Sequence, residues 1–204
     1  MGTRERRARE KHQRRQDILA AARKLFWERG YEKSTMPRIA REAELAPGTL
    51  YLYFPSKQAL YAELLNEGYD ILLGRFRQAV RPDLSPREQA DALIDAFTQF
   101  ARDHPEYFDI IFFVMVREGS AVAELNLEPS QRSRLAEREE ACKRVAADVL
   151  RRAGVPDDDV TRKVETIWSM LAGVVLYSPR EDPDAFAAMG REAKHLILRG
   201  IFGD

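Results

Sequence analysis

Cysteine is almost absent from this sequence, which contains a single one, Cys142. One thiol cannot form a disulfide within the chain, and it supplies too few ligands for a cysteine-based metal site. We therefore expect a protein of a reducing compartment, without a disulfide framework or a redox-active thiol pair.

Long apolar runs are missing as well. The longest extends from Ile110 to Val116, far below the ~18–20 residues that a membrane-spanning helix needs. The N-terminal stretch MGTRERRAREKHQRR is charged but has no apolar segment behind it, so it lacks the pattern of a signal peptide. These absences predict a cytoplasmic protein with no membrane partner.

Motifs for catalysis and metal binding are also lacking. The three histidines, His12, His104 and His195, are scattered, and no H-x-x-x-H spacing, G-x-S-x-G motif or phosphate-binding loop is present. The glutamates between positions 137 and 140 lie among arginines, which is typical of ion pairs on a helix surface. We therefore expect neither an enzyme nor a protein with a metal ion or another cofactor.

The formal net charge of +0 conceals an uneven distribution. Residues 1–60 contain 14 Lys and Arg against 7 Asp and Glu, a balance of +7, whereas residues 61–204 contain 19 against 26, a balance of −7. A basic N-terminal block on an acidic body indicates that the block alone binds a polyanion.

Helical patterns cover most of the chain, and no alternating segment is long enough for a confident strand. Ile18, Ala22, Leu25 and Phe26 form the apolar face of a first helix, which Gly30 ends. Further helices are expected over 36–43, 47–54, 57–80, 86–101, 105–116, 132–153, 160–177 and from 183 nearly to the C-terminus, with a loop over 119–130. The sequence thus predicts an all-α protein.

Two short helices in the basic block, joined by a tight connection, form a helix-turn-helix pattern. The second opens with Pro47 and Gly48, which allow its free amides and positive dipole end to approach phosphate closely. The hydroxyl groups of Thr49 and Tyr51 suit phosphate oxygens, and Lys57 follows as a point charge. Aromatic residues at helical spacing are more often core residues. Here the shortness of the segment, its Pro-Gly opening and the local charge favour DNA.

The stretches AARKLFWERGY, TMPRIAREA and GTLYLYFPSKQAL, within residues 18–64, resemble the DNA-binding domain of TetR-family transcriptional regulators. The resemblance implies a homodimeric repressor of about nine helices, with a helix-turn-helix domain over residues 1–60 and an effector-binding and dimerisation domain over residues 61–204. Carried over residue by residue, it implies contacts with a palindromic operator by Thr35, Arg38, Pro47, Gly48, Thr49, Tyr51, Leu52, Tyr53 and Lys57. Glu44 and Ala46 depart from the family pattern, which commonly has Gly and Ser in this turn.

Two interpretations of the basic block stay open. The run RERRAREKHQRR fits an arm that touches phosphates or the adjacent minor groove, and it fits a solvated tail equally well. The whole chain also fits a helical interaction protein whose basic block binds RNA or an acidic partner. Palindrome-selective binding to duplex DNA would distinguish a regulator from such a protein.

The acidic body contains candidates for an interface and for an effector site. The helices predicted over 160–177 and from 183 onward carry more apolar surface than one helix face needs, which favours a homodimer interface. A largely apolar effector, such as a fatty acyl thioester or an aromatic compound, would suit an apolar pocket, with Arg102 and Arg117 available for an anionic end. The candidate lining residues are Phe97, Phe100, Tyr107, Phe108, Phe112, Phe113, Met115, Trp168 and Leu171.

Overall fold

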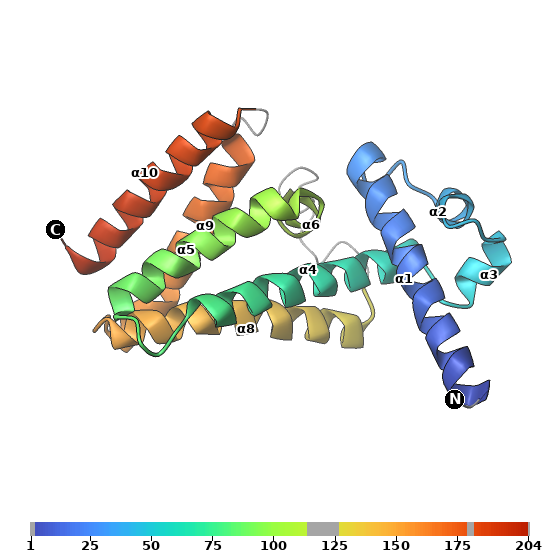
Figure 1. The fold of residues 1–204 in the computed structure, drawn as a ribbon, viewed down its shortest axis with the longest axis horizontal. Helices are drawn as coiled ribbons and strands as arrows, with labels where there is room; N and C mark the ends of the chain where they lie inside the picture. Colours follow the sequence, from blue (N-terminus) through green and yellow to red (C-terminus); the bar gives the residue numbers. More distant parts are fainter. Residues whose placement is uncertain (1–2, 114–126, 179–181, 204) are drawn as a thin grey trace. The chain divides into compact units, whose positions relative to one another are not determined.

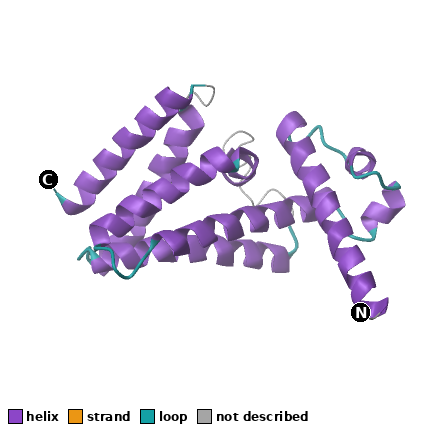
Figure 2. Cartoon of the chain, viewed as in Figure 1, coloured by secondary structure: helices purple, strands orange, loops and turns teal. Residues whose placement is uncertain are grey.

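The chain is built from helices (Figure 2). The computed structural model describes residues 3–113, 127–178 and 182–203, and within these ranges it contains nine α-helices, one π-helical segment and no strand. In chain order (Figure 1) the elements are α1 (Thr3–Arg29), α2 (Met36–Glu42), α3 (Pro47–Tyr51), α4 (Lys57–Ala79), α5 (Pro86–Asp103), α6 (Pro105–Phe108), the π-helix η1 (Asp109–Phe113), α8 (Pro129–Arg152), α9 (Asp157–Tyr177) and α10 (Pro183–Phe202). The prediction of an all-α protein of about nine helices is confirmed. No helix in these ranges combines the length and apolar character that crossing a membrane requires.

The chain divides into two compact units, and each contains segments that are distant in sequence. The first unit comprises Met1–Gly68 and Glu106–Leu135, and the second comprises Tyr69–Pro105 and Ala136–Asp204. The boundary expected from the sequence, between a DNA-binding domain over residues 1–60 and an effector-binding and dimerisation domain over residues 61–204, separates functions. It stays a prediction.

The core of the first unit is made by the apolar faces of its short helices. Ile18, Ile39 and Leu50, from α1, α2 and α3, have no exposed surface. Phe26, Tyr31 and Tyr61 form an aromatic cluster in which all three pairs of ring centroids are 4.9–5.5 Å apart. Edge-to-face and tilted rings at such distances add attraction beyond the area that they bury. The cluster joins the end of α1 to the first turns of α4.

Several helix ends follow directly from local sequence. Ser85 begins α5 with a complete capping box, because its hydroxyl accepts from the Glu88 amide while the Glu88 carboxylate accepts from the Ser85 amide. Asp182 caps α10 in a similar way, since its carboxylate accepts from two amides of the first turn. Both predicted starts are confirmed.

The first helix is longer than its apolar pattern predicts. The apolar face begins at Ile18, yet α1 starts at Thr3. The added residues are mostly Arg, Lys, Glu and Gln, which are good helix formers, and no Gly or Pro interrupts them. The basic N-terminal run is therefore part of a continuous helix.

The helix predicted over 105–116 differs from the structure in its type. Only Pro105–Phe108 is α-helical, and the chain continues as the π-helix η1, while residues 114–116 lie outside the described ranges. The Tyr61 hydroxyl donates a 2.6 Å hydrogen bond to the carbonyl oxygen of Ile110. A side chain at Gly68 would bring its Cβ to 2.9 Å from Ile111 Cδ1, so α4 packs very closely against η1. The π-helical turn, which is wider than an α-helical turn, occurs where these tertiary contacts are made. The apolar periodicity of the sequence does not predict such contacts.

Candidate functional site

The helix-turn-helix segment buries one side of α3 and exposes the other. Leu50 is fully buried and Phe54 is 3% exposed, whereas Tyr51 and Leu52 are 49% and 82% exposed. The two apolar side chains hold the short helix against the first unit. Tyr51 and Leu52 project outward, so the last residue of α3 and the C-cap residue after it offer an aromatic and an aliphatic side chain to a partner.

The turn before α3 has a defined backbone geometry. Glu44 lies in the left-handed region at φ 56°, and it is the one non-glycine residue with positive φ in the described ranges. The Leu45 amide donates to the Ala40 carbonyl at 2.8 Å, and the Glu44 amide donates to the Arg41 carbonyl at 3.1 Å. This pair of bonds is the Schellman motif, which usually has glycine at the left-handed position. The tight turn is thus preserved although the sequence supplies Glu44.

The predicted DNA-contacting residues come from three parts of the first unit: the start of α2, the α3 segment and the start of α4. The exposed members are Thr35, Arg38, Pro47, Gly48, Tyr51 and Leu52, and the half-buried ones are Thr49, Tyr53 and Lys57. Thr35 occupies the N-cap position of α2, but its side chain makes no capping hydrogen bond. These residues lie in one continuous region of the sequence, and their contact with DNA stays a prediction.

Both cationic residues in this group, Arg38 and Lys57, also interact within the chain. Arg38 Nη1 donates to the carbonyl oxygen of Lys33 at 3.0 Å. Lys57 Nζ donates to the carbonyl oxygen of Tyr31 at 2.9 Å and lies 3.9 Å from the centre of the Tyr31 ring. The Lys57 ammonium therefore helps to hold α4 against the end of α1. Its other two N–H groups can still bind a phosphate.

Sequence reasoning missed a half-buried polar network in the first unit. Arg23 Nη1 donates to the Tyr107 hydroxyl at 2.5 Å, and this hydroxyl donates to Glu67 Oε2 at 2.8 Å. Arg23 also lies 4.8 Å from the centre of the Tyr107 ring and 3.7 Å from a carboxylate oxygen of Glu106. Burial, followed by the nearby charge of Glu67, raises the pKa of Tyr107 to about 12. The network links α1, α4 and α6, and its members are too far apart in sequence to form a motif.

The second unit contains a small apolar cavity of about 50 Å³. It lies among α4, α5, α8, α9 and α10, and its lining consists of Phe76, Ala90, Leu93, Ile94, Phe97, Ala146, Val149, Leu150, Val164, Ile167, Trp168, Leu171, Ile197 and Ile201. Trp168 meets Phe97 and Phe76 edge-on, with ring centroids 5.6 and 6.4 Å apart. A water molecule needs two to four polar partners, and this lining offers almost none. The cavity is suited to an apolar group.

The structure brings together only some of the predicted effector residues. Phe97, Trp168 and Leu171 line the cavity. Phe100 belongs to the same unit but is fully buried outside the lining, while Tyr107, Phe108 and Phe112 are buried in the first unit. Arg102 is exposed on α5. Met115, Arg117 and the side chain of Phe113 lie outside the described residues.

Family models match both units. Residues 18–64 match the model of bacterial regulatory proteins of the tetR family, and residues 90–180 match the tetracyclin repressor-like C-terminal domain. The chain belongs to the TetR family. The resemblance noted in the sequence is confirmed, and the helix-turn-helix of α2 and α3 is that of a DNA-binding protein of transcription regulation.

Individual TetR-family proteins match different shares of the chain. The HTH-type transcriptional activator FasR of Mycolicibacterium smegmatis is 34% identical over 100 residues, which are 49% of this chain and 46% of FasR. The HTH-type transcriptional repressor KstR2 of Rhodococcus jostii is 37% identical over 81 residues, 40% of each chain. The structure of the ketosteroid transcriptional regulator KstR2 of Mycobacterium tuberculosis superimposes with a TM-score of 0.71 at 26% identity, covering 92% of this chain and 94% of that one. This chain spans less than half of the length of the curated relatives that it matches.

Proposed function

We propose that this TetR-family protein binds a palindromic DNA operator as a homodimer and represses transcription until a small, largely apolar effector releases it. The observation that carries the proposal is the two-sided end of α3, where Leu50 is buried while Tyr51 and the C-cap residue Leu52 are exposed. A helix anchored on one side and free on the other is suited to enter the major groove. In the proposed complex, Tyr51 and Leu52 contact base edges and thymine methyl groups, and Lys57 contacts the phosphate backbone.

Genomic selection tests the DNA-binding part of the proposal. Fragments retained by the protein are sequenced and searched for a shared inverted repeat, because a two-fold dimer binds two half-sites at a fixed spacing. Recovery of one such repeat supports the proposal, and recovery of none contradicts it. Retention of RNA in place of duplex DNA would favour an RNA-binding protein instead.

The homodimer is proposed from the surfaces of α9 and α10. Exposed apolar side chains recur on both helices: Met170 and Tyr177 on α9 are 41% and 82% exposed, and Met189 and Leu196 on α10 are 40% and 53% exposed. Exposed apolar side chains gathered on neighbouring helices commonly mark a protein interface. Sedimentation of wild type and of Tyr177→Glu/Leu196→Glu tests this, because two charges in an apolar interface should produce monomers. A double variant that stays dimeric would exclude these helices.

The effector is proposed to be largely apolar because the cavity in the second unit has an apolar lining. At about 50 Å³ the cavity is far smaller than the ~300–1,000 Å³ of a typical ligand site. An effector of ordinary size must therefore widen it by moving side chains such as Phe97 and Trp168. A TetR-family neighbour named as a ketosteroid regulator is consistent with a large apolar ligand.

Tryptophan fluorescence can test this site directly, because the chain has two tryptophans and only Trp168 lines the cavity. In Trp27→Phe, which removes the exposed tryptophan of α1, all remaining indole emission comes from Trp168. Fatty acyl thioesters, steroids and simple aromatic compounds are titrated, and mass spectrometry identifies any molecule that copurifies. A binding effector should shift the emission and weaken the operator complex by roughly 5- to 150-fold. Ala146→Leu, which fills the cavity, should reduce both responses while leaving ligand-free DNA binding intact.

The sign of regulation differs among the relatives. The relatives include a protein named as an activator and one named as a repressor. A reporter gene placed behind the selected operator decides between them. Repression requires higher expression after deletion of the gene, and activation requires lower expression.

A further inference from the structure

The first turns of α1 carry a stripe of basic side chains on one face. From residue 4 to residue 15 the chain has seven Arg and Lys and two Glu. At about 100° per residue, Arg4, Arg7, Lys11 and Arg14 fall within an arc of about 80°. We call these four residues the basic stripe.

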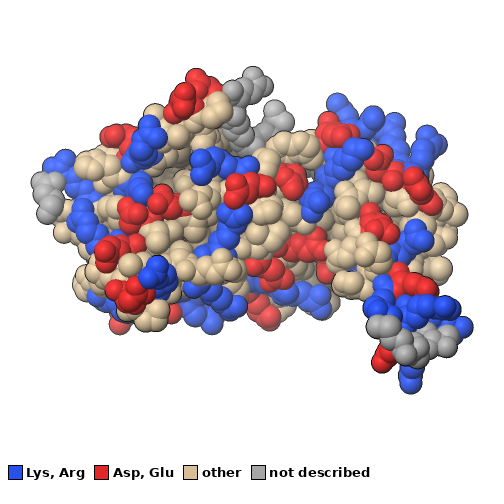
Figure 3. Space-filling view, in the orientation of Figure 1, with Lys and Arg blue, Asp and Glu red and all other residues tan. Residues whose placement is uncertain are grey.

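The four residues of the basic stripe make no ion pairs with acidic side chains in the described part of the chain. All four are exposed. The two acidic residues of the segment, Glu5 and Glu10, lie outside the arc, and Glu10 pairs with Arg6 at 3.5 Å. On the face shown in Figure 3, blue atoms predominate at this end of α1.

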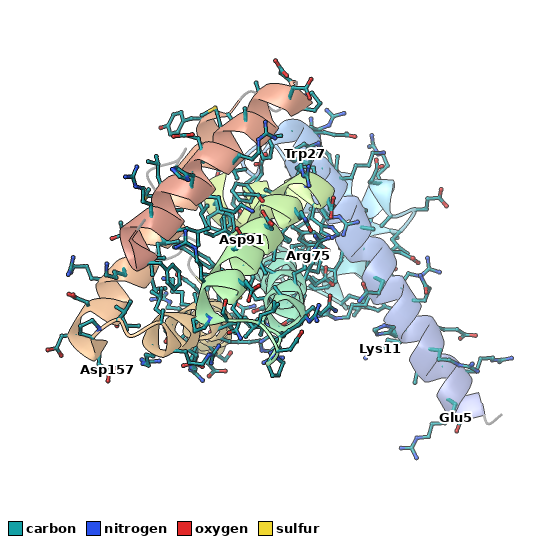
Figure 4. The ribbon with its side chains drawn as sticks, turned by 60° about the vertical axis from the view of Figure 1, so that its left-hand side comes forward. Glu5, Lys11, Trp27, Arg75, Asp91 and Asp157 are labelled. Carbon is teal, nitrogen blue, oxygen red and sulfur yellow. The ribbon has the colours of Figure 1, made fainter. Side chains whose placement is uncertain are left out.

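The stripe is held next to the helix-turn-helix by Arg15. The guanidinium of Arg15 lies 4.7 Å from the centre of the Phe54 ring, and its Nη2 is 3.0 Å from Glu63 Oε1. Phe54 closely follows α3, so the stripe begins beside the segment proposed to enter the major groove. Figure 4 labels Lys11 and Glu5 on these turns of α1, which other helices do not cover. A continuous helix fixes the direction of the stripe from this anchor.

Helix formation brings the like charges of the stripe together. Arg4 and Arg7, Arg7 and Lys11, and Lys11 and Arg14 are neighbours at three or four residues, and such pairs of equal charge destabilise a helix. Glu10, which lies three residues from Arg7 and four from Arg14, offsets only part of this repulsion. A polyanion would remove it.

We propose that the basic stripe binds the phosphate backbone of duplex DNA next to the half-site that α3 contacts, an inference that rests on the proposed operator binding. An α-helix with its side chains is ~10–12 Å wide and the minor groove is ~6 Å wide, so the extension lies against the backbone rather than inside the groove. At ~1.5 Å per residue, residues 3–15 are about 20 Å long, which corresponds to about six base pairs. The protein therefore contacts DNA beyond the bases that it reads.

Two matched double variants test the proposal. Arg7→Gln/Lys11→Gln removes two charges from the stripe, and Arg6→Gln/Arg9→Gln removes two from the other faces of the same helix. Each phosphate contact contributes about 0.9 to the slope of log affinity against log salt, so the stripe variant should lower the slope by about 1.8 per bound subunit. Between about 50 and 200 mM salt, the affinity of the stripe variant should therefore fall less than the affinity of wild type, by a factor of roughly ten for each bound subunit. The control variant should keep the wild-type slope.

Operator duplexes of two lengths provide an independent readout. Adding about six base pairs outside each half-site should strengthen binding by wild type and by the control variant, but not by the stripe variant. Circular dichroism and melting temperature establish that all three proteins are equally folded. Equal salt slopes for the two double variants, or no dependence on the flanks, would overturn the inference. A stripe variant that loses affinity for an RNA hairpin but keeps its operator affinity would overturn it as well.

The failure of this inference can be told apart from the failure of operator binding. If wild type selects no duplex, the proposed function is wrong. If wild type binds its operator and the stripe variant behaves like the control, only the role of the basic stripe is wrong.

Discussion

The ammonium group of Lys57 caps the face of the Tyr31 ring at 3.9 Å and donates to the Tyr31 carbonyl oxygen at 2.9 Å. A residue inferred to contact DNA therefore also stabilises the fold. We expect Lys57→Met to lower the free energy of unfolding by about 1 kcal/mol, because a cation–π contact and a hydrogen bond from a charged group are lost. Urea unfolding measures this. Lys33→Met, at an exposed lysine, serves as the control and should unfold like wild type.

The opposite sides of α3 should respond differently to truncation. Leu50→Ala should lower the free energy of unfolding by about 2–4 kcal/mol because it leaves a cavity under a fully buried side chain. Tyr51→Ala should change stability by less than about 0.5 kcal/mol and weaken operator binding by roughly tenfold or more. Urea unfolding and operator titration of both variants provide the comparison. A stable Leu50→Ala protein, or an unfolded Tyr51→Ala protein, would contradict the arrangement of α3.

The left-handed conformation of Glu44 should make glycine the better residue at this position. A side chain in this region costs about 1–2 kcal/mol, part of which is offset by the greater flexibility of glycine in the unfolded chain. We expect Glu44→Gly to raise the free energy of unfolding by up to about 1 kcal/mol. Arg41→Gly, in the helical last turn of α2, should lower it by about the same amount. If both variants lose stability equally, the turn does not have the geometry described.

Stability at alkaline pH should depend on Tyr107. Because its pKa is raised to about 12 in the folded protein, compared with an ordinary value near 10, folding favours the neutral phenol. This contribution is complete below about pH 10 and is lost as the pH rises toward 12. Tyr107→Phe should therefore be less stable than wild type near pH 8, where two hydrogen bonds of the network are missing. It should lose less stability than wild type between about pH 10 and 12.

Thermal unfolding at several pH values measures this difference. Tyr51→Phe, at an exposed tyrosine, controls for the removal of a hydroxyl group. Burial also raises the pKa of Tyr69. The Tyr107→Phe variant should therefore still lose some stability at alkaline pH, because Tyr69 remains in it. Parallel stability curves for wild type and Tyr107→Phe would exclude the network as the cause.

The sequence predicts those parts of the molecule whose causes are local. The starts of α5 and α10 follow from Ser85 and Asp182, whose capping bonds reach only three residues along the chain. The helix-turn-helix is predictable for the same reason, because the residues that begin and end its helices and the residues that it exposes lie within one short stretch of sequence. The N-terminal extension of α1 was left open as an arm or a tail, although its composition favours a helix.

Features that depend on distant partners could not be predicted. Five of the aromatic residues proposed for the effector site are buried, as their type suggests: Phe97, Phe100, Tyr107, Phe108 and Phe112. They belong to both units, however, and composition does not say which cavity a buried ring faces. Arg23 and Tyr107 are 84 residues apart and meet only in the folded chain. The contacts of η1 with Tyr61 and Gly68 likewise join residues that are distant in sequence.

An apolar lining limits what the cavity in the second unit can distinguish. Without hydrogen-bonding groups, such a site separates molecules by size and shape, and one methylene changes binding by only about 1–3 kcal/mol. Several compounds with the same hydrocarbon portion would then compete on similar terms, whatever their polar ends. In a cell that contains a mixture of these compounds, the occupancy of the cavity would depend on their summed concentration. Its output would track the total abundance of a chemical class, and dose–response curves for single compounds would underestimate its sensitivity in vivo.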